Sequence, residues 1–251
     1  MMITSAKVLF YHNTFVSLWI FGFVMTNDIE NRLKEIKQAL PEGVELLAVS
    51  KTHPVELLMQ AYGAGQRIFA ENKVQEMASK HLQMPDDVIW HFIGHVQRNK
   101  IRMMAPFVSV IHGVDSYDVL AETDRQAKRF GRRIVCLLQI HIAREETKFG
   151  FSPEECTAML EHCAWKELKN VTIGGVMGMA SRTDDNSIVE SEFRLLKDFF
   201  DRTREKFFSD SADFRTISAG MSGDWPVAVK CGSNMVRIGT DIFGCRNYDL
   251  Q

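Results

Sequence analysis

A lysine stands where an apolar stretch of strand length ends and a proline-containing turn begins. The run Val44–Val49 is almost continuously aliphatic, as is typical of a buried parallel strand, and Lys51 follows it closely. Pro54 suits the first turn of a helix, with Thr52 as a candidate cap before it. In parallel α/β folds ligands bind at this end of the strands, and a partly desolvated lysine there can attack a carbonyl carbon. Taken by its position alone, Lys51 fits a solvated loop lysine better than a nucleophile.

Other polar residues occupy the same kind of position after later predicted strands. Asn72 follows the second strand, His95 the third and Lys148 the fifth. Because the carboxyl ends of parallel strands meet on one rim, we expect these side chains to surround Lys51. For Lys148, beside two glutamates, a salt-bridged loop is an alternative. His91, between two aromatic residues, is more typical of a buried histidine with its hydrogen bonds satisfied.

The loops after the last two predicted strands are rich in small and hydroxyl-bearing residues. Ser218–Gly223 follows the seventh strand, and Arg237–Thr240 closes the eighth. Barrels commonly bind phosphate in these two loops through backbone amides, and hydroxyls such as those of Ser222 and Thr240 can add contacts. A lysine on one side of the rim and phosphate-binding loops on the other predict a phosphorylated carbonyl compound as ligand.

Strand and helix patterns alternate along the chain and predict the element that positions these residues. The predicted strands are Val44–Val49, Arg67–Glu71, Val88–Gly94, Phe107–His112, Ile134–Ile142, Val171–Val176, Phe214–Ser218 and Met235–Ile238. Eight such strands predict an α/β protein with a single (β/α)8 TIM barrel, and Thr26–Leu40 adds an extra N-terminal helix. A doubly wound sheet is the alternative, but it usually carries a Gly-x-Gly-x-x-Gly fingerprint that this sequence lacks.

The composition excludes several classes of function. Thirty basic and 32 acidic side chains leave a net charge of -2, which gives no electrostatic footprint for nucleic acid or an anionic membrane. The five cysteines include no Cys-x-x-Cys pair, so we expect free thiols in a reducing compartment and no structural zinc.

Residues 1–24 form an apolar N-terminal extension. The run from Val8 to Val24 is interrupted by His12 and Asn13, which leaves too few clean apolar residues for a spanning helix. No small-residue cleavage site follows it, as a signal peptide would require. We therefore expect the working protein to begin near Met25, with residues 25–251 as the barrel; a membrane anchor is the alternative.

Five segments, in order, resemble a known family. They are Ala48–Lys51, Phe69–Glu76, Trp90–Lys100, Ser218–Asp224 and Gly232–Gly244. The resemblance is to the pyridoxal phosphate homeostasis proteins, whose barrel is similar to that of bacterial alanine racemase and eukaryotic ornithine decarboxylase. It runs from about Met25 to the C-terminus. Ala70 and Asn234 depart from the family's usual glycine and threonine, which affects only loop details.

The resemblance implies pyridoxal 5'-phosphate (PLP) as cofactor and a role for each matching residue. Lys51 would hold PLP as a Schiff base, and Arg237 would face the pyridine nitrogen. A guanidinium there opposes protonation of the ring and makes it a poorer electron sink. An ion pair of Arg237 with Asp241 is the alternative. The other implied contacts are Asn72 beside the ring and Ser218, Ser222, Gly239 and Thr240 at the phosphate.

The function implied is that of a cytoplasmic, monomeric carrier and regulator of PLP, which delivers it to PLP-dependent apo-enzymes. We expect no catalytic residues and no bound metal. We also expect no binding to nucleic acid or to a membrane. A PLP-dependent racemase or decarboxylase is the alternative. Such racemases carry a second, β-rich domain that supplies a tyrosine for proton transfer, and the predicted barrel ends too close to Gln251 for us to expect one. A lysine-based aldolase without bound cofactor is a third possibility.

Overall fold

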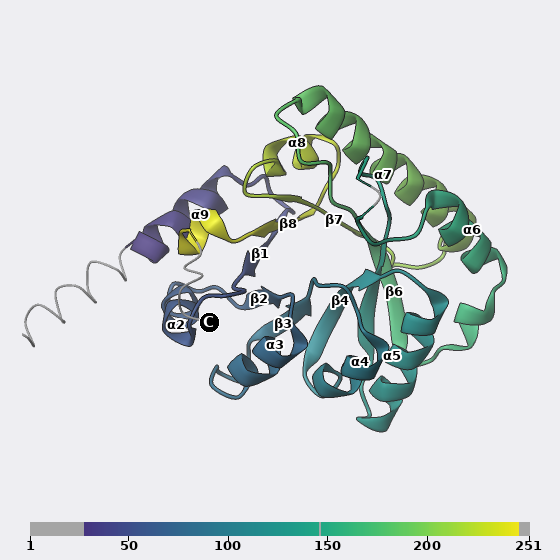
Figure 1. Cartoon of the computed structure of the whole chain (residues 1–251), viewed down its shortest axis with the longest axis horizontal. Helices are drawn as coiled ribbons and strands as arrows, with labels where there is room; N and C mark the ends of the chain where they lie inside the picture. Colours follow the sequence, from purple (N-terminus) through teal and green to yellow (C-terminus); the bar gives the residue numbers. More distant parts are fainter. Residues whose placement is uncertain (1–27, 146, 246–251) are drawn as a thin grey trace, which may run out of the picture.

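Eight parallel strands close into a barrel, in which each strand pairs with the next and β8 pairs with β1. The computed structural model describes residues 28–145 and 147–245. The strands are β1 (Glu45–Val49), β2 (Ile68–Glu71), β3 (Ile89–Phe92), β4 (Val108–Val114), β5 (Ile134–Gln139), β6 (Val171–Met177), β7 (Thr216–Met221) and β8 (Met235–Ile238). Figure 1 shows the strands in the middle and the helices around them. The predicted (β/α)8 barrel is confirmed.

Helices connect successive strands and cover the outside of the barrel. They are α2 (Val55–Gly63), α3 (Val74–His81), α4 (Arg98–Met104), α5 (Tyr117–Arg129), α6 (Pro153–Glu161), α7 (Asn186–Phe207), α8 (Trp225–Lys230) and α9 (Thr240–Phe243), with a 3-10 helix η1 (Ala164–Glu167) after α6. α6 begins with a capping box, in which Ser152 and Glu155 each accept from the other's backbone amide.

The extra N-terminal helix is also present, and residues 28–39 are helical. Ile29 and Leu33 are buried against the core, and Arg32 Nη1 donates to Ile242 O at 3.5 Å. This helix, purple in Figure 1, therefore lies beside α9 at the end of the barrel sequence. The predicted extension 1–24 and its boundary lie outside the described residues.

Two local predictions were wrong. The fifth strand ends at Gln139 and not at Ile142, because the chain then turns back to pair Ile140 with Phe151. With six residues it is shorter than β4 and β6, which have seven each. Thr52 does not cap α2, whose N-cap is Pro54.

The barrel has an outer and an inner packing layer. Along β1, Leu46 and Ala48 belong to the large core between strands and helices, whereas Leu47 and Val49 pack with Ala70 in a separate cluster. Alternate residues of a barrel strand face the interior, so this smaller cluster fills it. Arg237 is the register partner of Leu47, and it therefore faces the interior as well.

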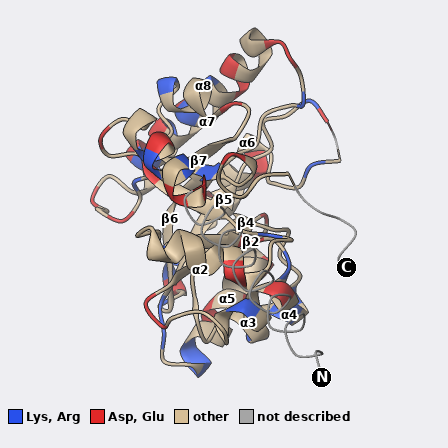
Figure 2. Cartoon of the chain, turned by 90° about the vertical axis from the view of Figure 1, so that its left-hand side faces the viewer, with Lys and Arg blue, Asp and Glu red and all other residues tan. Residues whose placement is uncertain are grey.

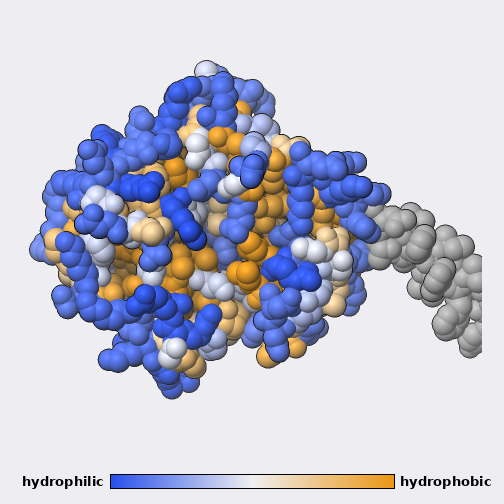
Figure 3. All heavy atoms as spheres, turned by 180° about the vertical axis from the view of Figure 1, so that it is seen from behind, coloured by the Kyte–Doolittle hydropathy of each residue, from blue (hydrophilic) through white to orange (hydrophobic). Residues whose placement is uncertain are grey.

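The surface carries both signs of charge. Figure 2 shows basic and acidic segments interspersed over the helices on that side. Figure 3 shows the molecule from the side opposite to that of Figure 1, with hydrophilic residues around the periphery and apolar residues towards the centre. Within residues 28–145 and 147–245, no helix has the length and apolar character needed to cross a membrane.

Candidate functional site

Lys51 lies half-buried in a short segment between β1 and α2 that is fixed on both sides. Ser50 before it is completely buried, and its backbone amide donates to Ala70 O at 3.0 Å. Thr52 after it has φ 68°, in the left-handed region. A β-branched residue is a genuine outlier there, at a cost of about 1–3 kcal/mol. Surrounding contacts must therefore hold the segment in this conformation.

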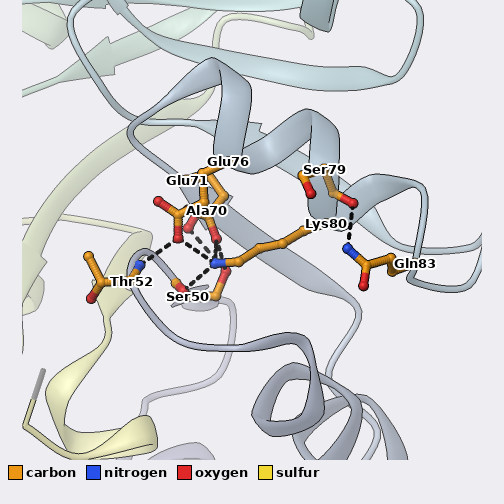
Figure 4. A network of polar contacts seen from close by, with 8 residues as sticks. All are labelled: Ser50, Thr52, Ala70, Glu71, Glu76, Ser79, Lys80 and Gln83. Carbon is orange, nitrogen blue, oxygen red and sulfur yellow. Dashed lines mark hydrogen bonds and ion pairs between the residues drawn. The ribbon is translucent and has the colours of Figure 1, made fainter. Parts of the chain in front are cut away.

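A buried ionic cluster supplies those contacts (Figure 4). We use the name Lys80 cluster for Lys80, Glu71 and Glu76. Lys80 Nζ donates to Ser50 O at 2.8 Å and to Oε1 of each glutamate at 2.7 Å. The three protons of its ammonium group are thus all used. Glu76 Oε1 also accepts from the backbone amide of Thr52 at 2.6 Å, and the Ser50 hydroxyl donates to Glu71 Oε1 at 2.7 Å.

The charge balance of the Lys80 cluster depends on Glu71. Burial raises the pKa of the Glu71 carboxyl from 4.5 to about 7. The nearby Glu76 also raises this pKa, whereas Lys80 lowers it. Its second oxygen, Oε2, is buried without a hydrogen-bond partner. An ionised carboxylate is costly in such surroundings unless it is fully paired. Glu71 is therefore the member whose charge changes near neutral pH.

Arg237 lies inside the barrel on β8 and is buried. Its Nη1 donates to Ser218 O at 2.7 Å and to Ser218 Oγ at 2.8 Å, and its Nη2 donates to Gly178 O at 2.9 Å. Burial lowers the pKa of the guanidinium to about 10, and nearby Asp224 opposes this shift, so the group stays charged at neutral pH. These contacts, and not the ion pair considered with the exposed Asp241, hold Arg237 in place.

Two buried histidines, His112 and His91, continue the hydrogen-bond chain from Arg237 and Ser218. His112 Nδ1 lies 3.1 Å from Ser218 Oγ, and His112 Nε2 lies 3.0 Å from His91 Nδ1. Burial lowers the pKa of His91 to about 3 and that of His112 well below its usual value, and the Arg237 charge adds to the second shift. Both rings are therefore neutral. The expectation that His91 is a buried histidine with a satisfied hydrogen bond is confirmed.

Of the residues predicted to hold phosphate, Ser222, Gly239 and Thr240 lie at the rim and Ser218 does not. Ser222 and Gly239 are half-buried and Thr240 is exposed, whereas Ser218 is completely buried and its hydroxyl contacts Arg237 and His112. A Cβ atom added at Gly239 would come 2.9 Å from Val49 O. The absence of a side chain there lets the turn after β8 approach the end of β1, close to Lys51.

Asn72 is half-buried and directly follows β2. A Cβ atom added at Gly94 would lie only 2.2 Å from the Asn72 carbonyl oxygen. The backbone after β3 thus packs directly onto the backbone of Asn72. This contact fixes Asn72 one strand away from Lys51.

The remaining polar residues of the rim are paired. Lys148 Nζ donates to Ala180 O at 2.6 Å and lies 3.2 Å from Glu145, which confirms the salt-bridged loop. His95 Nδ1 lies 3.1 Å from Asp115, and its ring stacks on Phe149 with centroids 3.8 Å apart. No group of three or more histidine, cysteine or acidic residues with metal-binding geometry occurs in the described part of the chain.

Sequence reasoning missed the Lys80 cluster and His112. A signal for the cluster was available, because Glu76 and Lys80 are four residues apart on α3 and Lys80 falls on the same helix face as the buried Met77. Nothing in the sequence pairs His112 with His91, since β3 and β4 shift register between Trp90 and His91.

Comparison with known proteins connects this site to one group. Residues 24–247 match the family model described as the alanine racemase N-terminal domain. A pyridoxal phosphate homeostasis protein of Haemophilus influenzae is 38% identical over 211 residues, which cover 83% of this chain and 87% of that protein.

Solved structures agree with the sequence comparison. The PipY structure of Synechococcus elongatus with PLP bound has a TM-score of 0.78 and 34% identity, and the match covers 86% of this chain and all of that one. An alanine racemase of Clostridium difficile matches with a TM-score of 0.72 over 89% of this chain and 58% of its own. Its identity of 16% establishes a shared fold only.

Proposed function

Because the chain belongs to the family of pyridoxal phosphate homeostasis proteins, we propose that it binds PLP through a Schiff base on Lys51 and takes part in intracellular PLP balance without catalytic turnover. The observation that carries this proposal is the position of Lys51 at the exit of β1. The turn after β8 lies next to this exit, and it can come so close because residue 239 is a glycine. The name of the PipY structure, with PLP bound, supports the same cofactor.

The side chains present fit an aromatic aldehyde that carries a phosphate. PLP, when bound, supplies an aldehyde carbon that condenses with a primary amine. Lys51 would supply that amine: its unprotonated form would bond to this carbon as C=N, and the carbonyl oxygen would leave as water. Lys51 is the residue at the end of β1 that has such an amine, and it is half-buried.

The phosphate side of the proposal depends on the loops after β7 and β8. We assign phosphate contacts to the Ser222 and Thr240 hydroxyls and to the backbone at Gly239, where no Cβ blocks the approach of an anion. The phosphate contact predicted for Ser218 would require its buried hydroxyl to leave both Arg237 and His112. We therefore assign Ser218 to the support of Arg237.

The ring side depends on Arg237 and Asn72. Arg237 would oppose protonation of the pyridine nitrogen because its guanidinium is charged, buried and fixed by three hydrogen bonds. A ring that stays unprotonated stabilises carbanions poorly. Asn72, held by its backbone packing at Gly94, would lie beside the ring.

Binding without turnover is supported by the surroundings of three histidines. A racemase needs a second proton-transfer group besides the lysine. His112 uses both ring nitrogens in hydrogen bonds, and burial keeps it and His91 neutral. His95 is paired with Asp115 and stacked on Phe149. The relatives' name, a homeostasis protein, points the same way. We place this activity in the cytoplasm, with PLP-dependent apo-enzymes as recipients.

The test combines a binding measurement with an activity assay. The protein is incubated with PLP, reduced with borohydride and digested, and mass spectrometry locates the pyridoxyl group. We expect it on Lys51, with visible absorbance that disappears on reduction and none in Lys51→Ala. A pyridoxyl group on another lysine, or none, contradicts the proposal. Racemisation or decarboxylation of amino acids that is lost in Lys51→Ala would establish the enzyme alternative.

A further inference from the structure

We propose that Glu76 and Lys80 are positioning residues for Lys51: they hold the backbone on both sides of it and thereby set the direction in which its amine points. This inference rests on the proposed function of Lys51, and neither residue contacts the ligand in it. Lys80 fixes the residue before Lys51 through the Ser50 carbonyl, and Glu76 fixes the residue after it through the Thr52 amide.

The conformation of Thr52 shows that the segment needs this support. Threonine at φ 68° is strained, and its hydroxyl is buried without a hydrogen-bond partner, so its side chain contributes no compensating bond. The compensating contact is the 2.6 Å hydrogen bond from the Thr52 amide to Glu76 Oε1. A hydrogen bond to a carboxylate is stronger than one between neutral groups. Without Glu76, Thr52 gains by relaxing to a negative φ, and Lys51 turns with it.

The partners of Lys80 explain why the cluster acts as a unit. One ammonium group bonds the Ser50 carbonyl and both glutamates. The Lys80 side chain is 7% exposed and the Glu76 side chain 21%. Two elements, β1 with its exit and α3, are thus joined at a single nitrogen atom. Movement of α3 relative to β1 would move both neighbours of Lys51 together.

A merely structural role for the cluster predicts something different. Removal of Glu76 would then lower stability but leave the reactivity of Lys51 in the folded protein unchanged. Positioning predicts that the loss of reactivity depends on the strain at Thr52. Thr52→Gly removes that strain, because glycine adopts positive φ at no steric cost. The two changes should therefore be non-additive.

The experiment compares five forms of the full chain: wild type, Glu76→Ala, Thr52→Gly, the double variant and Glu56→Ala. Glu56 is the matched control, an exposed glutamate in the first turn of α2 as Glu76 is in the first turn of α3. Two readouts are taken on folded protein at one pH. The first is the apparent Kd for PLP, with the adduct mapped after borohydride. The second is the rate at which trace acetic anhydride labels Lys51, which needs no cofactor.

We expect Glu76→Ala to weaken PLP binding and to change the labelling rate of Lys51 by about tenfold, the cost of ordering one residue. Glu56→Ala should match wild type, and adding Glu76→Ala to Thr52→Gly should change either readout by less than about threefold. The inference is overturned if Glu76→Ala matches wild type, or if its effect is as large in the Thr52→Gly background. If wild type forms no PLP adduct on Lys51, the proposed function is wrong but the positioning inference is not. The labelling rate of Lys51 still tests the positioning, because it needs no cofactor.

Discussion

Arg237 donates to the Ser218 hydroxyl at 2.8 Å, and this bond sets the direction of every hydrogen bond beyond it. A guanidinium has no acceptor, so the Ser218 oxygen must accept. Among the described residues, the one acceptor that the Ser218 hydroxyl proton meets is His112 Nδ1. His112 must then carry its proton on Nε2 and donate to His91 Nδ1, which leaves the His91 proton on Nε2.

The first prediction is that both buried histidines are neutral Nε2–H tautomers. Nitrogen chemical shifts of histidine-labelled protein would show this pattern unchanged from about pH 5 to pH 8, because burial depresses both pKa values. In Ser218→Ala the donor to His112 Nδ1 is lost, and the pattern should become mixed. An Nδ1–H signal from His112 in the wild type would contradict the assigned direction.

The second prediction concerns replacement of Arg237 by lysine. An ammonium group cannot reproduce the fork that reaches both Ser218 and Gly178, so at least one buried carbonyl loses its donor. We expect Arg237→Lys to lower the free energy of unfolding in urea by about 2 kcal/mol. Arg98→Lys is the control, because Arg98 is 63% exposed and pairs with an exposed Asp118. A change there should stay below about 0.5 kcal/mol. Equal effects of the two variants would show that the fork contributes nothing.

The repeat of strands and helices predicted the barrel, because aliphatic runs and helix signals depend on nearby residues alone. Lys51 could be singled out for a related reason, since strand ends can be read from the sequence, whereas the role predicted for Arg237 came from the resemblance to a family. The left-handed Thr52 could not be predicted, because a contact from Glu76 on α3 stabilises a conformation that threonine avoids. The burial of Ser218 was also missed: a register shift between β7 and β8 after Ser218 separates it from the loop that follows.

The third prediction is a pH dependence of stability that originates in Glu71. Its pKa is raised to about 7 in the folded protein from an ordinary value of 4.5, so the folded state binds more protons than the unfolded state between these values. The free energy of unfolding should therefore fall as pH rises from about 4.5 to about 7 and not change further through Glu71 above that. The contribution is on the order of 3 kcal/mol.

Urea unfolding of wild type and Glu71→Gln at pH 5, 6, 7 and 8 would measure this effect. Glutamine keeps an oxygen that can accept from Lys80 and Ser50 but does not titrate. The difference in free energy between the two proteins should change across pH 5 to 7 and be constant from pH 7 to 8. A difference that is the same at all four pH values would show that Glu71 has the same charge state throughout.

The fourth prediction uses the close contact between Gly239 and β1. A Cβ atom at this position would lie 2.9 Å from the Val49 carbonyl oxygen and 3.3 Å from Val49 Cβ, both part of a strand that cannot give way easily. Gly239 has a negative φ of -122°, so an alanine there avoids the left-handed region, and we expect its main effect to be this crowding. Gly239→Ala should therefore displace the turn before α9 away from the exit of β1. The phosphate contact proposed for this turn should be lost with little change at the Lys51 amine.

Two comparisons test this prediction: the affinity for PLP against that for pyridoxal, and the effect of Gly239→Ala against that of Gly223→Ala. We expect Gly239→Ala to bind PLP about tenfold more weakly, equal to about 1.4 kcal/mol, and to bind pyridoxal, which has no phosphate, as wild type does. Gly223→Ala is the matched control: Gly223 lies in the neighbouring loop, and an added Cβ there meets nothing within 4 Å. It should leave both affinities unchanged. If Gly239→Ala weakens PLP and pyridoxal equally, the turn after β8 acts on the amine side and the phosphate must be held elsewhere.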